Sequence, residues 1–177
     1  MRYRRSRFPG GTYFFTVNLA DRSGNLLVAN VHALRAAVRQ VTRRHPFQIR
    51  AMVVLPEHLH AIWTLPVDDA DYPMRWNLIK AAFSRQLENT ESVSDSRKRR
   101  GERGIWQRRY WEHLIRDDED LATHIDYIHL NPVKHGYVKR AADWPHSSIH
   151  RFVSAGILPI DWAGQDDRGE HGEPRER

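Results

Sequence analysis

The stretch FQIRAMVVLPEHLHAIWTL, residues Phe47–Leu65, contains two runs rich in β-branched, aromatic and other apolar residues. These runs predict strands at Phe47–Leu55 and at His58–Leu65. Only two residues lie between the runs, so a hairpin is expected. The second run also carries two polar rings one residue apart, and these rings need an explanation.

His58 and His60 should project from the same face of the second strand, because side chains two residues apart point the same way. Leu59 and Ala61 would then point the other way, into the core. Two adjacent imidazoles can bind one metal ion. With 11 histidines in the chain, they could equally be surface residues or hydrogen-bonded core residues. The spacing alone leaves these alternatives open.

Outside this hairpin, apolar periodicity predicts a strand at Thr12–Leu19, helices at Val31–Arg44, Met74–Leu87 and Asp117–Asn131, and an extended segment at Trp106–Ile115. Pro132 is expected to end the last helix. The order strand, helix, strand, strand, helix, strand, helix predicts an α+β fold. We expect a ferredoxin-like sandwich, in which helices pack on an antiparallel sheet.

The composition favours an anionic partner. The chain has 28 Lys and Arg against 22 Asp and Glu, a net charge of +6 and a pI near 10.0, which favours nucleic acid. It has no cysteine, which excludes disulfides, thiolate zinc sites and cysteine nucleophiles. No stretch approaches the roughly 20 apolar residues of a membrane helix. No signal peptide is evident either, so we expect a soluble cytoplasmic protein.

The chain length of 177 residues suits one domain, expected over residues 1–164, with a disordered tail at residues 165–177. The segment Asn89–Gly104 has almost no apolar residue and is expected to be a mobile loop. It ends in a basic run from Arg97 to Arg103.

A second segment with chemical potential is HIDYIHLNPVKHG, residues His124–Gly136. Tyr127 and Asn131 are four residues apart and so share a helix face. Taken alone, Tyr127 could be a packing residue and Asn131 a helix cap. Together with His58 and His60, the amide oxygen would complete three protein ligands, which is the layout of an open catalytic metal site. The tyrosine would then be placed to attack a phosphate that the metal polarises.

Four motifs, PEHLH, RYWEHLIRDDEDL, HIDYIHLNPVKHG and WPHSS, occur here in an order that resembles the REP-associated tyrosine transposases. These belong to the single-tyrosine HUH transposases, where HUH means His, hydrophobic residue, His. The resemblance runs from about Arg4 to Gly164. It implies a ferredoxin-like fold with the HUH pair on a central strand, a divalent metal (Mg²⁺ or Mn²⁺), and single-stranded DNA with hairpins as substrate.

By position, the resemblance implies that His58 and His60 bind the metal, with Asn131 as third ligand. It implies that Tyr127 attacks DNA, leaving a 5′-phosphotyrosine and a free 3′-hydroxyl. Many relatives in the wider group use glutamine where Asn131 stands, and asparagine matches the REP-associated branch. The basic loop from Arg97 to Arg103 is longer than that branch leads us to expect.

Several further residues are candidates for binding DNA or metal. The candidate phosphate contacts are Arg4, Arg5, Arg7, Lys80, Arg108, Arg109 and Lys134. For any one of them a solvated charged face is the alternative, whereas the set favours a nucleic-acid surface. Bases could stack on Tyr3, Phe8 or Trp162. Alternative metal ligands are His113, His129 and His135, of which His129 should point away from the Tyr127 side of its helix.

The sequence leaves three functions open. The leading one is a metal-dependent strand transferase that acts on single-stranded hairpin DNA. The second is a hairpin-binding module without catalysis, and the third is a phosphodiesterase that activates water, with Tyr127 structural. The resemblance to the REP-associated branch also implies a monomer.

Overall fold

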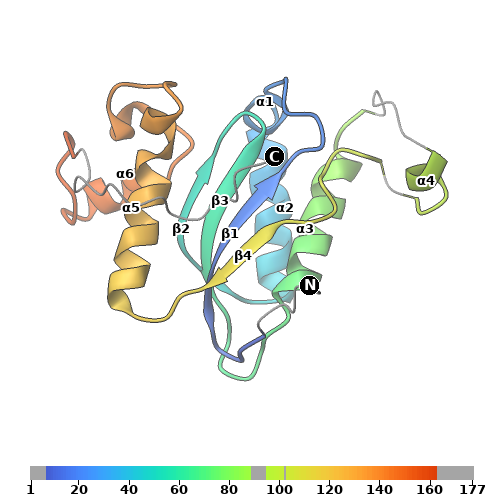
Figure 1. Ribbon diagram of the computed structural model, residues 1–177, viewed down its shortest axis with the longest axis horizontal. Helices are drawn as coiled ribbons and strands as arrows, with labels where there is room; N and C mark the ends of the chain where they lie inside the picture. The colour runs from blue at the N-terminus through green and yellow to red at the C-terminus, as the bar shows by residue number, and fades with distance from the viewer. Residues whose placement is uncertain (1–6, 89–94, 102, 163–177) are drawn as a thin grey trace, which may run out of the picture.

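The computed structural model of the protein describes residues 7–88, 95–101 and 103–162 (Figure 1). The expected tail at 165–177 and part of the expected loop, residues 89–94, lie outside these ranges. The elements are, in chain order, β1 (Thr12–Asn18), α1 (Leu26–Ala29), α2 (Val31–Arg44), β2 (Gln48–Val54), β3 (His58–Thr64), α3 (Tyr72–Arg85), α4 (Asp95–Lys98), β4 (Trp111–Leu114), α5 (Asp118–Lys134), the 3-10 helix η1 (Ala141–Asp143) and α6 (Ile149–Ser154).

The four strands form one antiparallel sheet in the order β2-β3-β1-β4. Strand β1 pairs with β3 and β4, and β2 pairs with β3. The unit β1-α2-β2-β3-α3-β4 therefore has the connectivity of a ferredoxin-like fold. This confirms the predicted antiparallel α+β sandwich, with the two histidines on an interior strand of the sheet.

The two faces of the sheet are covered by different helices. Helices α2 and α3 pack together on one face, and α5 lies on the other, against β2 and β3 (Figure 1). Leu59 and Ala61 of β3 belong to the larger apolar core, under α2 and α3. Phe14, Ile62 and Ile128 belong to a smaller core, under α5. Successive residues of β3 thus point into different cores, as the period of two in a strand requires.

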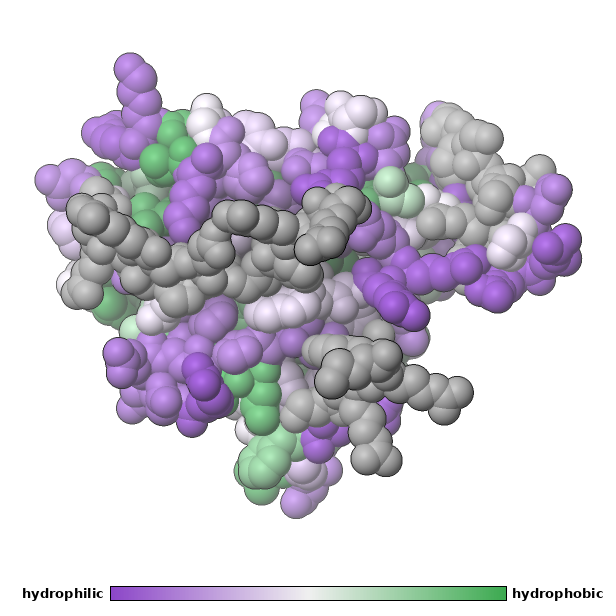
Figure 2. Space-filling model, in the orientation of Figure 1, coloured by the Kyte–Doolittle hydropathy of each residue, from purple (hydrophilic) through white to green (hydrophobic). Residues whose placement is uncertain are grey.

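Polar residues dominate the surface. Figure 2 shows hydrophilic residues over most of one face, with hydrophobic residues visible in small patches between them. Of the helices described, none combines the length and the apolar composition needed to cross a membrane.

Helix α5 continues through Pro132 to Lys134, so the prediction that Pro132 ends it is wrong. Proline removes its own N–H from the helical ladder and crowds the carbonyl four residues back, but it does not block the hydrogen bonds of the residues that follow. The following turn still closes, because the N–H of His135 donates to the carbonyl of Asn131 at 3.0 Å. The extra turn carries Lys134 and His135 on the same helix as Tyr127.

Other elements also differ from expectation. Helix α3 begins at Tyr72 rather than Met74, because the Asp71 carboxylate accepts the N–H of Met74 at 3.1 Å and a proline occupies the first turn. The predicted loop contains the short helix α4, and the extended segment forms a strand only over Trp111–Leu114. Local capping, which apolar periodicity does not report, explains the first difference.

Arg75 ties the end of α2 to the start of α3. Its side chain is 1% exposed and donates to both oxygens of Asp69 at 3.0 and 2.7 Å. It also donates to the carbonyls of His45, Pro46 and Asp71. The planar guanidinium fits this set of acceptors, whereas a lysine ammonium does not.

We therefore expect Arg75→Lys to lower the free energy of unfolding by about 3 kcal/mol, because lysine keeps the charge but loses the two-pronged contact with Asp69 and most of the hydrogen bonds to the three carbonyls. Urea denaturation followed by circular dichroism measures the change. Arg85→Lys, at the exposed end of the same helix, is the matched control and should be nearly neutral. Equal effects of the two substitutions would contradict a special role for Arg75.

Candidate functional site

The two histidines of β3 lie side by side beneath α5. His58 and His60 are both fully buried, and their ring centroids are 4.9 Å apart. They point away from Leu59 and Ala61, which belong to the opposite core. The expectation that the pair shares one face of a strand is confirmed.

A neighbouring side chain orients each imidazole. His58 Nδ1 donates to Glu57 Oε1 at 2.9 Å, and His60 Nδ1 lies 2.9 Å from Thr16 Oγ1 on β1. Burial alone would raise the pKa of Glu57, but the hydrogen bond and charge of His58, with the charge of Arg22, hold it below the ordinary value. Glu57 is therefore ionised at neutral pH, and its hydrogen bond with Nδ1 orients the His58 ring so that Nε2 points away from Glu57.

His60 is held in the neutral form. Burial lowers its pKa well below the ordinary value, and the charges of His58 and His135 lower it further. Only a neutral imidazole can bind a metal ion. His60 is therefore in the form that can bind a metal ion.

Helix α5 and its C-cap present Tyr127, Asn131 and His135 at intervals of four residues, and hence along one face, because His135 keeps a helical conformation. The Tyr127 ring lies 5.2 Å from that of His60, and the His135 ring lies 5.2 Å from that of His58. Asn131, halfway between them on the helix, is 1% exposed and so faces the sheet at the histidine pair. The structure thus brings together the four residues on which the sequence argument rested.

Two atoms of this group stand out within the described part of the chain. His58 Nε2 and Asn131 Oδ1 are buried and have no hydrogen-bond partner there. Buried polar atoms are almost always paired, so two such acceptors at one place need an explanation. An imidazole nitrogen and an amide oxygen can each use a lone pair to bind a divalent cation, so the residues present fit a metal ion.

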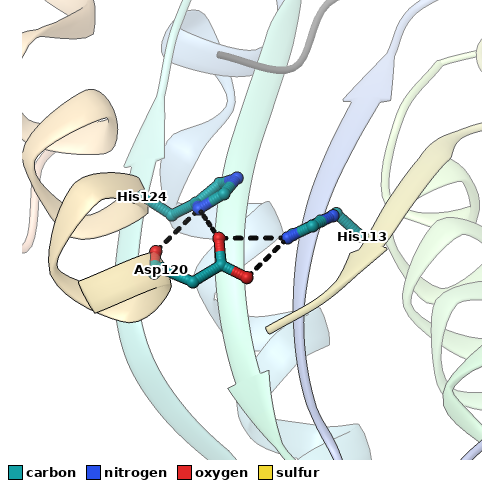
Figure 3. Close-up of side chains that lie close together, drawn as sticks. All are labelled: His113, Asp120 and His124. Carbon is teal, nitrogen blue, oxygen red and sulfur yellow. Dashed lines mark hydrogen bonds and ion pairs between the residues drawn. The ribbon is translucent and has the colours of Figure 1, made fainter. Parts of the chain in front are cut away.

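The structure also assembles a group that the sequence argument identified only in part. His113 on β4 and Asp120 and His124 on α5 place ligand atoms within 4.8 Å of one another, and they could hold a metal ion (Figure 3). His113 Nε2 donates to the Asp120 carboxylate at 2.9 Å, and His124 Nδ1 donates to the Asp120 carbonyl at 2.8 Å. The i, i+4 spacing of Asp120 and His124 was the available sequence signal.

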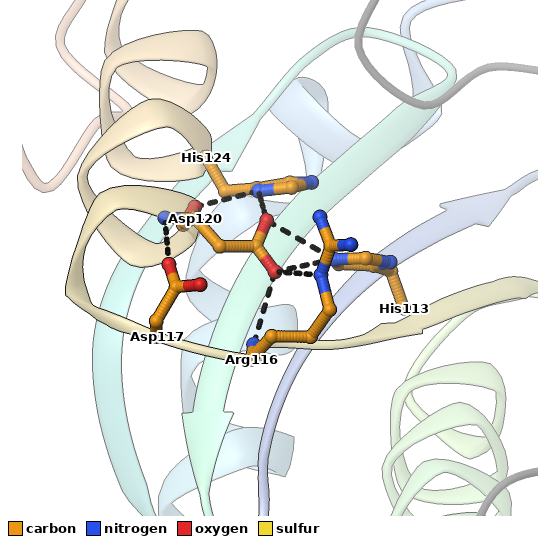
Figure 4. Close-up of polar contacts among 5 residues, drawn as sticks. All are labelled: His113, Arg116, Asp117, Asp120 and His124. Carbon is orange, nitrogen blue, oxygen red and sulfur yellow. Dashed lines mark hydrogen bonds and ion pairs between the residues drawn. The ribbon is translucent and has the colours of Figure 1, made fainter.

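In this second group the potential ligand atoms already bind one another. Asp120 also accepts the backbone N–H of Arg116 at 3.0 Å and its Nε at 3.3 Å (Figure 4). Asp117 caps the helix by accepting the N–H of Asp120 at 2.8 Å. The cluster is thus a set of ion pairs that fastens the start of α5 to β4. It is close to the histidine pair, since the Phe14 ring contacts those of both His124 and His60.

The other candidate metal ligands lie in different surroundings. His129 points away from the Tyr127 face, as expected, and its Nε2 lies 3.0 Å from Ser148 Oγ. Burial lowers the pKa of His129 to about 4, with smaller contributions from Arg151 and His150. His135, in contrast, lies against His58 and so is the alternative ligand nearest the pair.

The candidate DNA contacts are dispersed. Arg4 and Arg5 lie outside the described residues, as does Tyr3, whereas Arg7, Arg108 and Arg109 are exposed. Lys80 and Arg108 line a pocket of about 540 Å³. Lys134 places Nζ 4.8 Å from the centre of the Tyr127 ring. Of the candidate stacking residues, Phe8 is exposed and Trp162 lies partly buried against His129.

Lys80, from this set, and Arg103, from the basic loop, have structural partners. Lys80 donates to the carbonyl of Gln107 at 3.0 Å. Arg103, in the basic loop, donates to the carbonyls of Ser84 and Leu87 and so caps the end of α3. Part of the basic loop therefore has a structural role, which the sequence could not indicate.

The Asp120 cluster should make stability depend on pH in acid. Burial would raise the pKa of Asp120, but hydrogen bonds from His113 and Arg116 lower it to about 2. Because the folded-state pKa is depressed, this stabilisation is present above pH 4 and is lost as the pH falls towards 2. Between pH 5 and 2 we expect the wild type to lose about 2 kcal/mol more unfolding free energy than Asp120→Asn. Urea denaturation of both proteins across this pH range measures the difference. If the two unfolding free energies fall in parallel with pH, the expectation is refuted.

Comparison with known proteins places this site in a family. No family model matches the chain. It is 49% identical over 162 residues to the REP-associated tyrosine transposase of Escherichia coli K12, covering 92% of this chain and 90% of that protein. A Haemophilus influenzae Rd protein assigned to the same family is 48% identical over 166 residues, covering 93% of this chain and 94% of that protein.

A solved structure agrees with these relatives. The REP-associated tyrosine transposase bound to a REP hairpin is 46% identical and superposes with a TM-score of 0.84, covering 100% of this chain and 99% of that one. Identity at this level over nearly the whole chain, together with a shared fold, shows that the chain belongs to the REP-associated tyrosine transposases.

Proposed function

We propose that the protein is a metal-dependent strand transferase that cleaves single-stranded DNA beside a hairpin through a 5′-phosphotyrosine intermediate. The observation that carries the proposal is the pair of buried, unpartnered ligand atoms, His58 Nε2 and Asn131 Oδ1, with Tyr127 packed against His60. The hairpin as substrate is supported by the relative whose structure contains a REP hairpin.

In this proposal His58, His60 and Asn131 hold a divalent cation, Mg²⁺ or Mn²⁺. Such an ion would withdraw charge from the scissile phosphate. Glu57 and Thr16 keep the two imidazoles in the orientation that leaves Nε2 for the ion. Asn131 is placed by α5 rather than by the sheet, so the site depends on how the helix docks.

Tyr127 supplies the nucleophile. Its phenol oxygen attacks phosphorus, and a bond to the tyrosine forms as the bond to the 3′-oxygen breaks. The phenol proton passes to solvent, and the departing oxygen takes up a proton to become a 3′-hydroxyl. The ammonium group of Lys134, 4.8 Å from the ring centre, adds a positive charge beside the nucleophile. Helix α5 packs on the sheet of its own chain, so we infer that a monomer suffices.

Covalent attachment suits strand transfer. The phosphotyrosine conserves the ester bond, so another 3′-hydroxyl can attack it and reseal the DNA without ATP. Activation of water would lose that bond. The Tyr127 ring packs at the edge of the smaller core and also stands beside the histidine pair, and this second contact favours the nucleophile over a purely structural tyrosine.

The nucleophile is tested by Tyr127→Phe, which removes only a hydroxyl. We expect cleavage of a labelled hairpin DNA and the covalent adduct to disappear on a denaturing gel. Stability should change by no more than about 1 kcal/mol, and DNA binding should persist. Tyr110→Phe is the control and should retain the adduct. An adduct in Tyr127→Phe would overturn the assignment, whereas cleavage without an adduct in the wild type would favour activation of water.

The metal site is tested by titrating Mn²⁺ into DNA-free protein in a calorimeter. His58→Ala should abolish binding, and Glu57→Gln should weaken it roughly 10- to 100-fold, because the imidazole loses its ionised partner. His124→Ala disturbs the second His/Asp group and should leave Mn²⁺ affinity unchanged. Binding that survives His58→Ala but not His124→Ala would move the metal to His113, Asp120 and His124.

A further inference from the structure

Helix α2 has a basic outer face that the proposed chemistry does not use. Its sequence, VHALRAAVRQVTRR, contains no Asp or Glu. His32, Arg35, Arg39 and Arg43 are exposed and are separated by three, four and four residues. This spacing aligns them along one side of the helix, opposite the apolar residues that pack on the sheet.

The charges on this face are not balanced by neighbours. Within the described ranges, Arg35, Arg39 and Arg43 form no ion pair. Like charges four residues apart on a helix repel each other and destabilise it. A face that served only to keep the protein in solution could carry both signs. The uniform sign therefore points to an anionic partner.

The positive charge continues around the edge of the sheet at β2. Arg50 is exposed on this strand, and the guanidinium of Arg151 donates to its carbonyl at 2.5 Å. Between α2 and this edge lies His146, whose pKa is lowered by burial and then by the charges of Arg35 and His32. We call the following residues the basic band: His32, Arg35, Arg39, Arg43, Arg50 and Arg151.

The basic band starts near the end of β3 that bears His58. The N–H of Leu27 in α1 donates to the carbonyl of Pro56, in the turn just before His58, at 3.1 Å. Helix α1 leads directly into α2, which lies on the far side of the sheet from α5 (Figure 1). His32 and Arg43 are 11 residues apart, or about 16 Å along the helix. One DNA strand spans that distance with about five phosphates.

We propose that the basic band binds the phosphate backbone of the duplex stem of the hairpin, while the histidine and tyrosine site takes the adjoining single strand. This inference rests on the proposed function. A duplex fits better than a single strand, because the band consists of Arg and His without the large aromatic platforms on which unpaired bases stack. Contacts of this kind position the stem without reading its sequence.

The test compares Arg35→Gln/Arg39→Gln/Arg43→Gln with the wild type on two DNA hairpins, one with a full stem and one with a stem about five base pairs shorter. The measurement is the slope of the logarithm of affinity against the logarithm of salt concentration. On the full stem we expect the variant to lose up to about three units of slope, since each phosphate contact contributes about 0.9. On the short stem, variant and wild type should coincide.

Arg85→Gln/Arg99→Gln/Arg100→Gln is the matched control, because it removes the same charge from exposed positions on the side of α3 and α4. Its slope on the full stem should stay within about one unit of the wild type. Equal losses in the two triple variants would overturn the inference, as would a loss that is the same on both stems. Wild-type protein that binds neither hairpin would instead refute the proposed function itself.

Discussion

The alternation of side chains along β3 is the constraint on which the rest of the structure depends. Both neighbours of this strand are hydrogen-bonded to it, so its register cannot slip by one residue without exchanging its two faces. In the observed register, Leu59 and Ala61 complete the core under α2 and α3, while His58 and His60 face α5. The larger core thus holds the imidazoles in position, because turning them away would expel apolar side chains from it.

Helix α5 is the second determinant, because it carries Tyr127 and Asn131. Its start is fastened to β4 by the ion pairs of Asp120 with His113 and Arg116. Its last turn continues beyond Pro132 and brings His135 against His58. Attachment at both ends sets how far the tyrosine ring lies from the histidine pair. Because β4 and α5 are close in the chain, the contacts at the start of α5 form between neighbouring segments.

The two groups that could hold a metal ion differ in how well their polar atoms are satisfied. In the His113, Asp120 and His124 group the imidazole protons meet the carboxylate or carbonyl of Asp120, so the group is stable as a set of ion pairs. At His58 and Asn131 the ligand atoms have no such partner among the described residues, although both are buried. Burial without a partner costs free energy, and a bound cation offsets that cost. This difference supports the proposal that a metal ion binds between β3 and α5, with Glu57 and Thr16 orienting the two histidines.

Much of this protein could be predicted from the sequence, because the relevant patterns are local. The period of two placed His58 and His60 on one face, the spacing of four placed Tyr127 and Asn131 on another, and the order of elements indicated the ferredoxin-like fold. Only the tertiary structure decided which faces meet, because contact between His60 and Tyr127 depends on strand order and helix docking. The same holds for Thr16, which reaches His60 across the sheet, and for Asp120, whose partner His113 belongs to another element. The end of α5 could not be predicted from Pro132 either. A proline lowers the stability of a helix without fixing where the helix ends, and here the hydrogen bonds of the following residues extend it.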